Sequence, residues 1–119
     1  MTQILNHKQY DLEERTLNFA KKIIEFTNKL PRTIANIEII KQLIRASGSI
    51  GANYIEANES LSKKDFLMRI KICKKEAKES CYWLKLLTID KAQEGKEKDL
   101  IQEVTELMKI FGAILEKSK

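Results

Sequence analysis

The sequence is poor in the residues that interrupt helices. It has one proline and four glycines in 119 residues, whereas 33% of its residues are charged and 43% are hydrophobic. A β-sandwich needs turn residues about every 8–12 positions, while long amphipathic helices need few. A chain of this length also has the size of one domain. We therefore expect a single all-α domain spanning residues 1–119.

Histidine and cysteine are equally scarce. The only histidine is His7, so the chain has neither the two Glu-x-x-His motifs of a di-iron bundle nor a His-based catalytic triad. It has no glycine-rich phosphate loop either. Cys73 and Cys81 lack the spacing of a metal or redox pair and are interpreted as reduced, buried small hydrophobes. The sequence predicts a protein without enzymatic activity, cofactor or metal.

Long apolar runs are also missing. No run approaches the roughly 18 residues that a membrane span requires, and the first residues lack the apolar centre of a signal peptide. A cytoplasmic location is therefore expected.

Hydrophobic periodicity predicts four helices, at about residues 11–30, 35–58, 63–89 and 98–116. Asp11, with Glu14 three residues later, is a candidate cap for the first helix, and Pro31 ends that helix. Ser62 with Asp65 is a candidate cap for the third. Short linkers force neighbouring helices to be antiparallel, so we predict an up-down-up-down four-helix bundle.

The third predicted helix contains most of the net positive charge. Residues 63–91 have nine Lys/Arg against four Asp/Glu, so this segment alone accounts for the net charge of +5. Its apolar seam steps by fours and threes, as in helix–helix packing. On the opposite side, at about 100–200° from the seam on a helical projection, lie Tyr82 and five lysines: Lys71, Lys74, Lys75, Lys78 and Lys85.

Two interpretations of these lysines remain open. Lysines belong on the outside of any bundle, so they could form a solvated face. A stripe that contains an aromatic ring and lacks acids is also typical of a surface for the phosphate backbone.

A third face of this helix combines an aromatic ring with charged side chains: Arg69, Ile72, Glu76, Glu79 and Trp83. Trp and Arg are enriched at interface centres. One interpretation is that Trp83 only widens the bundle core. The other is a subunit interface or polar network, in which Asn53, Glu56, Glu76 or Glu79 pairs with Arg45 or Arg69.

The second predicted helix contains an unusual stretch of small and polar residues, at positions 48–56. Gly48 and Gly51 each cost a helix about 1 kcal/mol relative to alanine, so close packing is expected to favour them. Asn53 and Glu56, together with Glu79, are predicted to be buried and hydrogen-bonded, because an unpaired polar group in an apolar interior is costly.

Three segments support a family resemblance: SIGANYIEA at residues 49–57, KDF at 64–66 and KEAKESCYWLKLL at 75–87. With RTLNFA at residues 15–20, they resemble the four-helix-bundle family of rRNA intervening-sequence proteins, which includes accessory proteins of diversity-generating retroelements. The resemblance covers roughly residues 12–90. It implies an antiparallel bundle that assembles as a ring-like homopentamer without enzymatic activity. In the retroelement branch it implies a basic ring that binds a reverse transcriptase and RNA or DNA.

Two classes of function follow. The protein is expected to be either an oligomeric accessory protein that binds nucleic acid through the lysines of the third helix, or a protein–protein scaffold in which those lysines only solubilise the ring.

Overall fold

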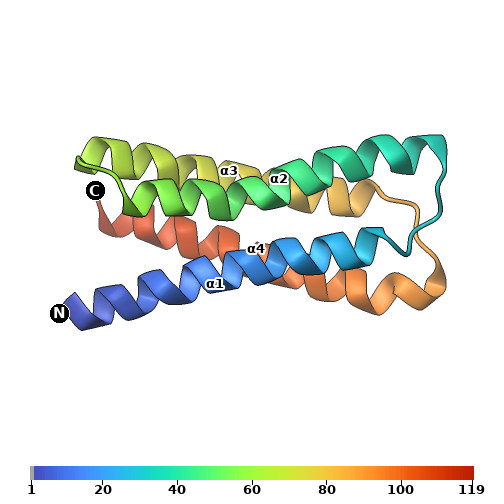
Figure 1. Ribbon diagram of the computed structural model, residues 1–119, viewed down its shortest axis with the longest axis horizontal. Coiled ribbons are helices and arrows are strands. Elements are labelled where there is room, and N and C mark those ends of the chain that lie inside the picture. The colour runs from blue at the N-terminus through green and yellow to red at the C-terminus, as the bar shows by residue number, and fades with distance from the viewer. Residues whose placement is uncertain (1) are drawn as a thin grey trace.

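The structure is a computed structural model that describes the backbone of residues 2–119 and the side chains of residues 11–119. It consists of α1 (Thr2–Thr27), α2 (Ile34–Asn58), α3 (Lys63–Leu86), a 3-10 turn η1 (Lys91–Gln93) and α4 (Glu94–Lys117), with no strand over these residues. Successive helices run in opposite directions along a body of 47 × 22 × 20 Å (Figure 1). The all-α four-helix bundle predicted from the sequence is confirmed.

The helix ends depart from the predicted ones in four places. α1 begins at Thr2, nine residues before Asp11, so the predicted cap at Asp11 is wrong: nothing in the preceding residues breaks the helix. α1 and α3 end three residues early, at Thr27 and Leu86. α4 begins at Glu94, four residues early, with acidic side chains in its first turn that suit a helix N-terminus.

The predicted cap of α3 is present. The Ser62 hydroxyl accepts a hydrogen bond of 3.1 Å from the backbone N–H of Asp65. Thr33 plays the same part for α2 and accepts from the Asn36 N–H at 3.1 Å. Both caps follow turns in which the chain reverses direction.

The core runs the length of the bundle between the four helices. On α3 the predicted seam is buried at Ile70, Cys73, Ala77, Ser80 and Leu84. The thiols of Cys73 and Cys81 are both free and buried, and burial raises the pKa of Cys73 to about 12. α2 and α3 share the largest interface, and α1 and α4 the smallest of the neighbouring pairs.

One end of the bundle is closed by a buried amide. Asn36 is fully buried, and its Nδ2 donates to the carbonyl oxygens of Pro31 at 3.0 Å and Thr88 at 2.8 Å. Its Oδ1 accepts from the Thr88 N–H at 3.0 Å. The side chain therefore joins the α1–α2 loop to the residues after α3.

Gly51 allows α1 to approach α2 closely. A methyl group at Gly51 would lie 2.9 Å from Thr16 Oγ1, which already donates to the Leu12 carbonyl at 2.8 Å. A methyl group at Gly48, one turn earlier, would meet no atom within 4 Å. Packing within the subunit thus accounts for Gly51 but not for Gly48.

The small α1–α4 interface is held by an ion-pair cluster. Arg15 donates from Nε to Glu103 Oε2 at 2.8 Å and from Nη2 to Glu103 Oε1 at 2.9 Å and Glu106 Oε1 at 2.8 Å. Hydrogen bonds from Gln102 and Arg15 hold the pKa of Glu106 below its usual value. The hydrogen bonds to Glu103 raise the pKa of Arg15.

Candidate nucleic-acid and subunit interfaces

The α3 lysine face consists of the five predicted lysines, Lys71, Lys74, Lys75, Lys78 and Lys85, with Tyr82. All five lysines are exposed, and Tyr82 keeps 59% of its surface in solvent. None of these lysines forms an ion pair with a residue from 11 to 119. The acids of the adjoining stretch are directed elsewhere: Glu76 is buried and Glu79 pairs with Arg45. The face therefore keeps its positive charge.

Lys74 lies across the groove between α3 and α4. A methyl group on Gly112 of α4 would meet Lys74 Nζ at 3.6 Å and Cε at 3.7 Å. The end of the lysine side chain therefore lies over the backbone of α4. Lys74 is therefore positioned against its neighbour helix.

The polar residues of the third face form a seam between α2 and α3. Arg45 Nη1 lies 3.6 Å from Glu76 Oε2, and Arg45 Nη2 lies 3.4 Å from Glu79 Oε1. Further along the seam, Arg69 Nη1 donates to Asn53 Oδ1 at 2.9 Å, and Asn53 Nδ2 donates to the Ser49 carbonyl at 2.9 Å. The structure thus brings these residues together within one subunit.

Glu56 is the exception. It was expected to be buried, but it is exposed, and that expectation is wrong. The expected burial of Glu79 is wrong as well, because its side chain keeps 40% of its surface in solvent although it pairs with Arg45. Glu56 follows Asn53 by three residues, so its side chain projects about 60° from that of Asn53 around the helix, further from the core. Glu76 is the buried carboxylate of this region, with 6% of its surface exposed.

Trp83 is half-buried and packs against the core while its ring meets Tyr82 edge-on, with centroids 5.1 Å apart. Its Nε1 is buried without a hydrogen-bond partner among the described residues, and so is Oε1 of Glu76. Within one subunit, Trp83 therefore widens the core, which is the simpler of the two interpretations of its role.

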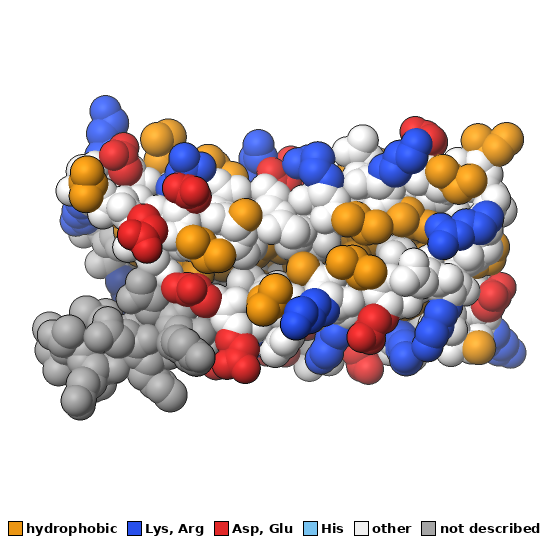
Figure 2. Space-filling view, in the orientation of Figure 1, with side chains coloured by type: hydrophobic (Ala, Val, Ile, Leu, Met, Phe, Trp, Pro, Cys, Tyr) orange, Lys and Arg blue, Asp and Glu red, His pale blue; other side chains and the backbone are white. Residues whose placement is uncertain are grey.

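Sequence reasoning missed an exposed apolar surface on the outer side of α1 and α2. We call it the α1–α2 apolar band. Its large members come from both helices and are exposed by 38–52%: Leu17, Ile24, Ile37, Ile44 and Ile55. Gly48 and Ala52 are also exposed there. Orange side chains cross the middle of this face in Figure 2. Periodicity could have found it, because α2 has apolar residues on more of its circumference than one core face needs.

The open end of the bundle contains a cleft of about 670 Å³ to which all four helices contribute. Its floor includes Leu12, Tyr54 and Ile110, and its rim includes Asp11 and Lys117. Burial raises the pKa of Tyr54 to about 12. The described residues that line the cleft include no constellation of nucleophile and base.

Neither a metal centre nor a membrane span is found in the part of the chain that the structure describes. No three His, Cys, Asp or Glu residues there are grouped so as to hold an ion. No helix there is long and apolar enough to cross a bilayer.

Comparison with known families identifies the family of this chain. The model of the 23S rRNA-intervening sequence protein family matches residues 8–113, nearly the whole chain. The chain belongs to this family. The intervening-sequence family was the one suggested by the segments at residues 49–57 and 75–87, so that resemblance is confirmed.

A solved structure agrees with the family assignment. The chain is similar to the crystal structure of a protein of unknown function from the S23 ribosomal protein family of Bacteroides thetaiotaomicron, with 29% identity and a TM-score of 0.78. The match covers 92% of this chain and 98% of that one, so the two proteins share the fold over nearly their whole length. No protein with a curated description matches the chain.

Proposed function

We propose that this intervening-sequence family member is a non-enzymatic, homo-oligomeric accessory protein that binds the backbone of RNA or DNA through the α3 lysine face. The observation that supports the proposal is a row of five exposed lysines without ion-pair partners among residues 11–119, beside an exposed tyrosine. A row of unpaired cations attracts phosphates and releases their counterions, while an aromatic ring can stack on an unpaired base.

Oligomerisation supplies the affinity that one subunit lacks. Five lysines offer at most five phosphate contacts, which give only weak, sequence-independent binding. Repeating the face around an assembly turns later contacts into intramolecular ones and adds avidity. The ring-like homopentamer implied by the family resemblance would present the face five times. A reverse transcriptase partner is proposed on that resemblance alone, and co-purification of the two proteins would test it.

The test compares two pairs of charge reversals in a salt titration with single-stranded RNA and duplex DNA. Lys75→Glu with Lys78→Glu alters the proposed face, and Lys91→Glu with Lys96→Glu makes the same charge change near η1. Wild-type binding should weaken linearly on a log–log plot of affinity against salt, with a slope of about −0.9 per neutralised phosphate of duplex DNA. The first pair should reduce affinity at least about tenfold and flatten the slope. The control pair should reduce affinity much less.

A protein–protein scaffold is the second candidate, and the α1–α2 apolar band favours it. The two candidates separate in the same titration. If wild-type protein binds neither RNA nor DNA at about 50 mM salt, or if both pairs of reversals act equally, the lysines form a solvated face and the scaffold is correct.

A further inference from the structure

The α3 lysine face contains a straight row of side chains in which one position is an aromatic ring. The members of the row follow one another by four and three residues in turn: Lys71, Lys75, Lys78, Tyr82 and Lys85. Steps of four and three keep side chains on one side of a helix, and these 14 residues span about 21 Å at 1.5 Å per residue. All five residues are exposed. Tyr82 therefore occupies a place where the spacing of the row would suit another lysine.

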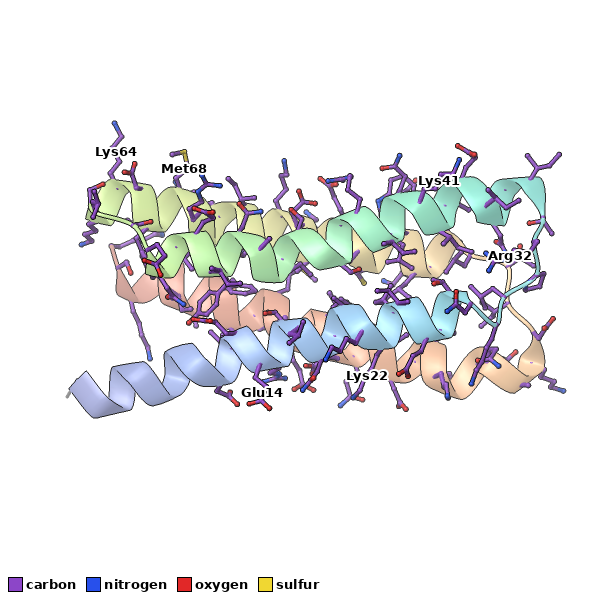
Figure 3. The ribbon with its side chains drawn as sticks, in the orientation of Figure 1. Glu14, Lys22, Arg32, Lys41, Lys64 and Met68 are labelled. Carbon is purple, nitrogen blue, oxygen red and sulfur yellow. The ribbon has the colours of Figure 1, made fainter. Side chains whose placement is uncertain are left out.

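The row faces away from the bundle. Lys64 and Met68 continue it toward the start of α3, because they lie seven residues before Lys71 and Lys75. Both are exposed, and both project outward from the bundle in Figure 3. Seven residues are close to two full turns of a helix, so the lysines of the row point to the same side. A chain molecule that runs along α3 can therefore contact the whole row.

Trp83 supports the ring of Tyr82 from one side. The two rings meet at an interplanar angle of 73° with their centroids 5.1 Å apart, and Trp83 itself packs against the core. An edge-to-face contact covers at most one face of the tyrosine ring, and more than half of the Tyr82 surface stays in solvent. The ring is thus held in place with a free face. This preorganisation lowers the entropy that is lost when a flat partner stacks on it.

Two lysines flank the ring along the row. Lys78 precedes Tyr82 by four residues and Lys85 follows it by three, which are the spacings of neighbouring side chains on a helix surface. Neither lysine forms an ion pair with a residue from 11 to 119. A flat molecule stacked on Tyr82 can therefore place an anionic group on each side of itself against a lysine. A nucleotide within a single strand has this chemistry, because its base has a free face and is flanked by phosphates.

A duplex lacks the free base face. Its bases are stacked on one another, so only its sugar–phosphate backbone would reach Tyr82. Charge alone favours the duplex, which gives a salt slope of about −0.9 per neutralised phosphate against about −0.7 for a single strand. Stacking of one base on an aromatic side chain contributes about 5- to 150-fold in affinity and depends little on which base it is. One well-placed ring is therefore sufficient to reverse the electrostatic preference.

We propose that Tyr82 is a base-stacking residue that makes the α3 lysine face selective for single-stranded RNA and DNA over duplexes. This selectivity rests on the proposed function, because the lysines must bind phosphate for the base to reach the ring. It adds to that function the class of strand and the residue that selects it. Because stacking does not read the base edges, selection acts on strandedness and not on sequence.

The test compares three ligands in equilibrium titrations: a single-stranded RNA, a single-stranded DNA of the same sequence, and its duplex with both ends closed by non-nucleotide linkers. Tyr82→Ala should weaken binding of both single strands at least about fivefold and change duplex binding less than about twofold. The salt slope should not change, because no cation is removed. Circular dichroism checks that the variant is folded.

Three further variants separate stacking from other roles of the side chain. Tyr82→Phe keeps the ring and should stay within about twofold of wild type, whereas Tyr82→Leu is apolar without a ring and should behave like Tyr82→Ala. Leu86→Ala removes an exposed apolar side chain one turn further along α3 and is the matched control, with an expected change below about twofold. A loss for Tyr82→Phe as large as that for Tyr82→Ala would assign the contact to the hydroxyl and contradict stacking.

A crosslink in the wild-type protein gives a readout that needs no variant. Irradiation of 5-iodouracil breaks its carbon–iodine bond and joins the base to an aromatic ring in contact with it. Single-stranded RNA and DNA that carry this base should therefore crosslink to Tyr82, and mass spectrometry locates the modified residue. Crosslinks confined to other residues would overturn the proposal even if the Tyr82 variants did not fold.

The outcomes distinguish the role of Tyr82 from that of the lysines. If the wild-type protein binds neither RNA nor DNA, the lysine face and the stacking residue are both wrong. If it binds, and the loss on Tyr82→Ala is equal for single strands and duplex or absent for both, the lysines bind phosphate but Tyr82 does not select the strand. In that case the proposed function stands and the stacking proposal alone is overturned.

Discussion

At the scale of single residues, Asn36 contributes more to the stability of the bundle than an exposed asparagine would. Its amide makes three hydrogen bonds to backbone groups of Pro31 and Thr88 and is fully shielded from water. Its removal leaves three partly buried backbone groups without their partner, and each such loss costs about 1–3 kcal/mol.

Asn36→Ala should therefore lower the free energy of unfolding by about 3–5 kcal/mol, measured by urea denaturation. Asn28→Ala, at an exposed asparagine of the same type, is the control and should change stability by no more than about 0.5 kcal/mol. A loss below about 1 kcal/mol for Asn36→Ala would mean that water replaces the amide as the hydrogen-bond partner of Pro31 and Thr88.

The two glycines of α2 predict opposite effects of one substitution. Gly51→Ala drives a methyl group to 2.9 Å from Thr16 Oγ1, so helices α1 and α2 must move apart, and stability should fall by about 1–3 kcal/mol. Gly48→Ala meets nothing within the subunit and should raise the stability of the isolated subunit by about 0.5–1 kcal/mol. Thermal unfolding of the two variants at low concentration measures both. If both substitutions changed stability in the same direction, the close approach of α1 and α2 would not depend on Gly51.

Residue-level predictions from the sequence succeeded where the partner was near and failed where it was distant. An amide on an apolar helix indicated that Asn53 needs a partner, and Arg69, 16 residues away, is that partner. The importance of Asn36 was not visible, because Thr88 lies 52 residues away and meets it only after the bundle has formed. The burial of Glu56 was wrong because one helix position decides between the seam and solvent.

At the scale of elements, local chemistry predicted the Ser62 cap of α3 but not the Thr33 cap of α2. Ser62 was identified because its hydroxyl precedes an apolar run and has Asp65 three residues later, and the cap is present. The same pattern at Asp11 was misleading, because the nine preceding residues continue the helix without interruption. A cap motif predicts a helix start only when the chain before it leaves the helix.

The α1–α4 contact should respond to acid. The hydrogen bonds from Gln102 and Arg15 hold the pKa of Glu106 below its usual value. A carboxylate with a depressed folded-state pKa stabilises the fold above its unfolded pKa of about 4.3, and this contribution is lost as pH falls through the folded pKa. Stability lent by the cluster should therefore be complete above about pH 5 and decline below it.

Arg15→Gln should reduce the free energy of unfolding near neutral pH, and its difference from wild type should shrink as pH falls below about 4.3. Urea denaturation across pH 3–7 measures that difference. Lys21→Gln removes an exposed charge that has no ion-pair partner among the described residues and should give a nearly constant offset. A constant offset for Arg15→Gln as well would mean that the ion pairs with Glu103 and Glu106 contribute nothing beyond packing.

At the scale of the whole molecule, the fold followed from the sequence because its causes are local. Scarce proline, four amphipathic stretches and short linkers permit few arrangements besides an antiparallel bundle. Of the two candidate interaction surfaces, only one was predicted from the sequence. The lysines of α3 were identified from their spacing, whereas the α1–α2 band escaped notice, because only the packed bundle shows which apolar side chains remain uncovered.

The two surfaces lie on different sides of the molecule, so their effects on nucleic-acid binding should combine in a defined way. Ile44→Gln with Ile55→Gln leaves every lysine of the α3 face unchanged but removes apolar surface from the α1–α2 apolar band, which is expected to reduce the number of copies, and so of lysine faces, in one assembly. Affinity for a long single-stranded RNA should then fall at least about tenfold through lost avidity. Binding of a short oligonucleotide that contacts only one face should stay within about twofold of wild type. Titration of both RNAs at one salt concentration measures the two effects. If affinity fell equally for both RNAs, Ile44 or Ile55 would belong to the nucleic-acid surface itself. If affinity were retained equally for both, the lysine faces of one assembly would bind RNA independently of one another.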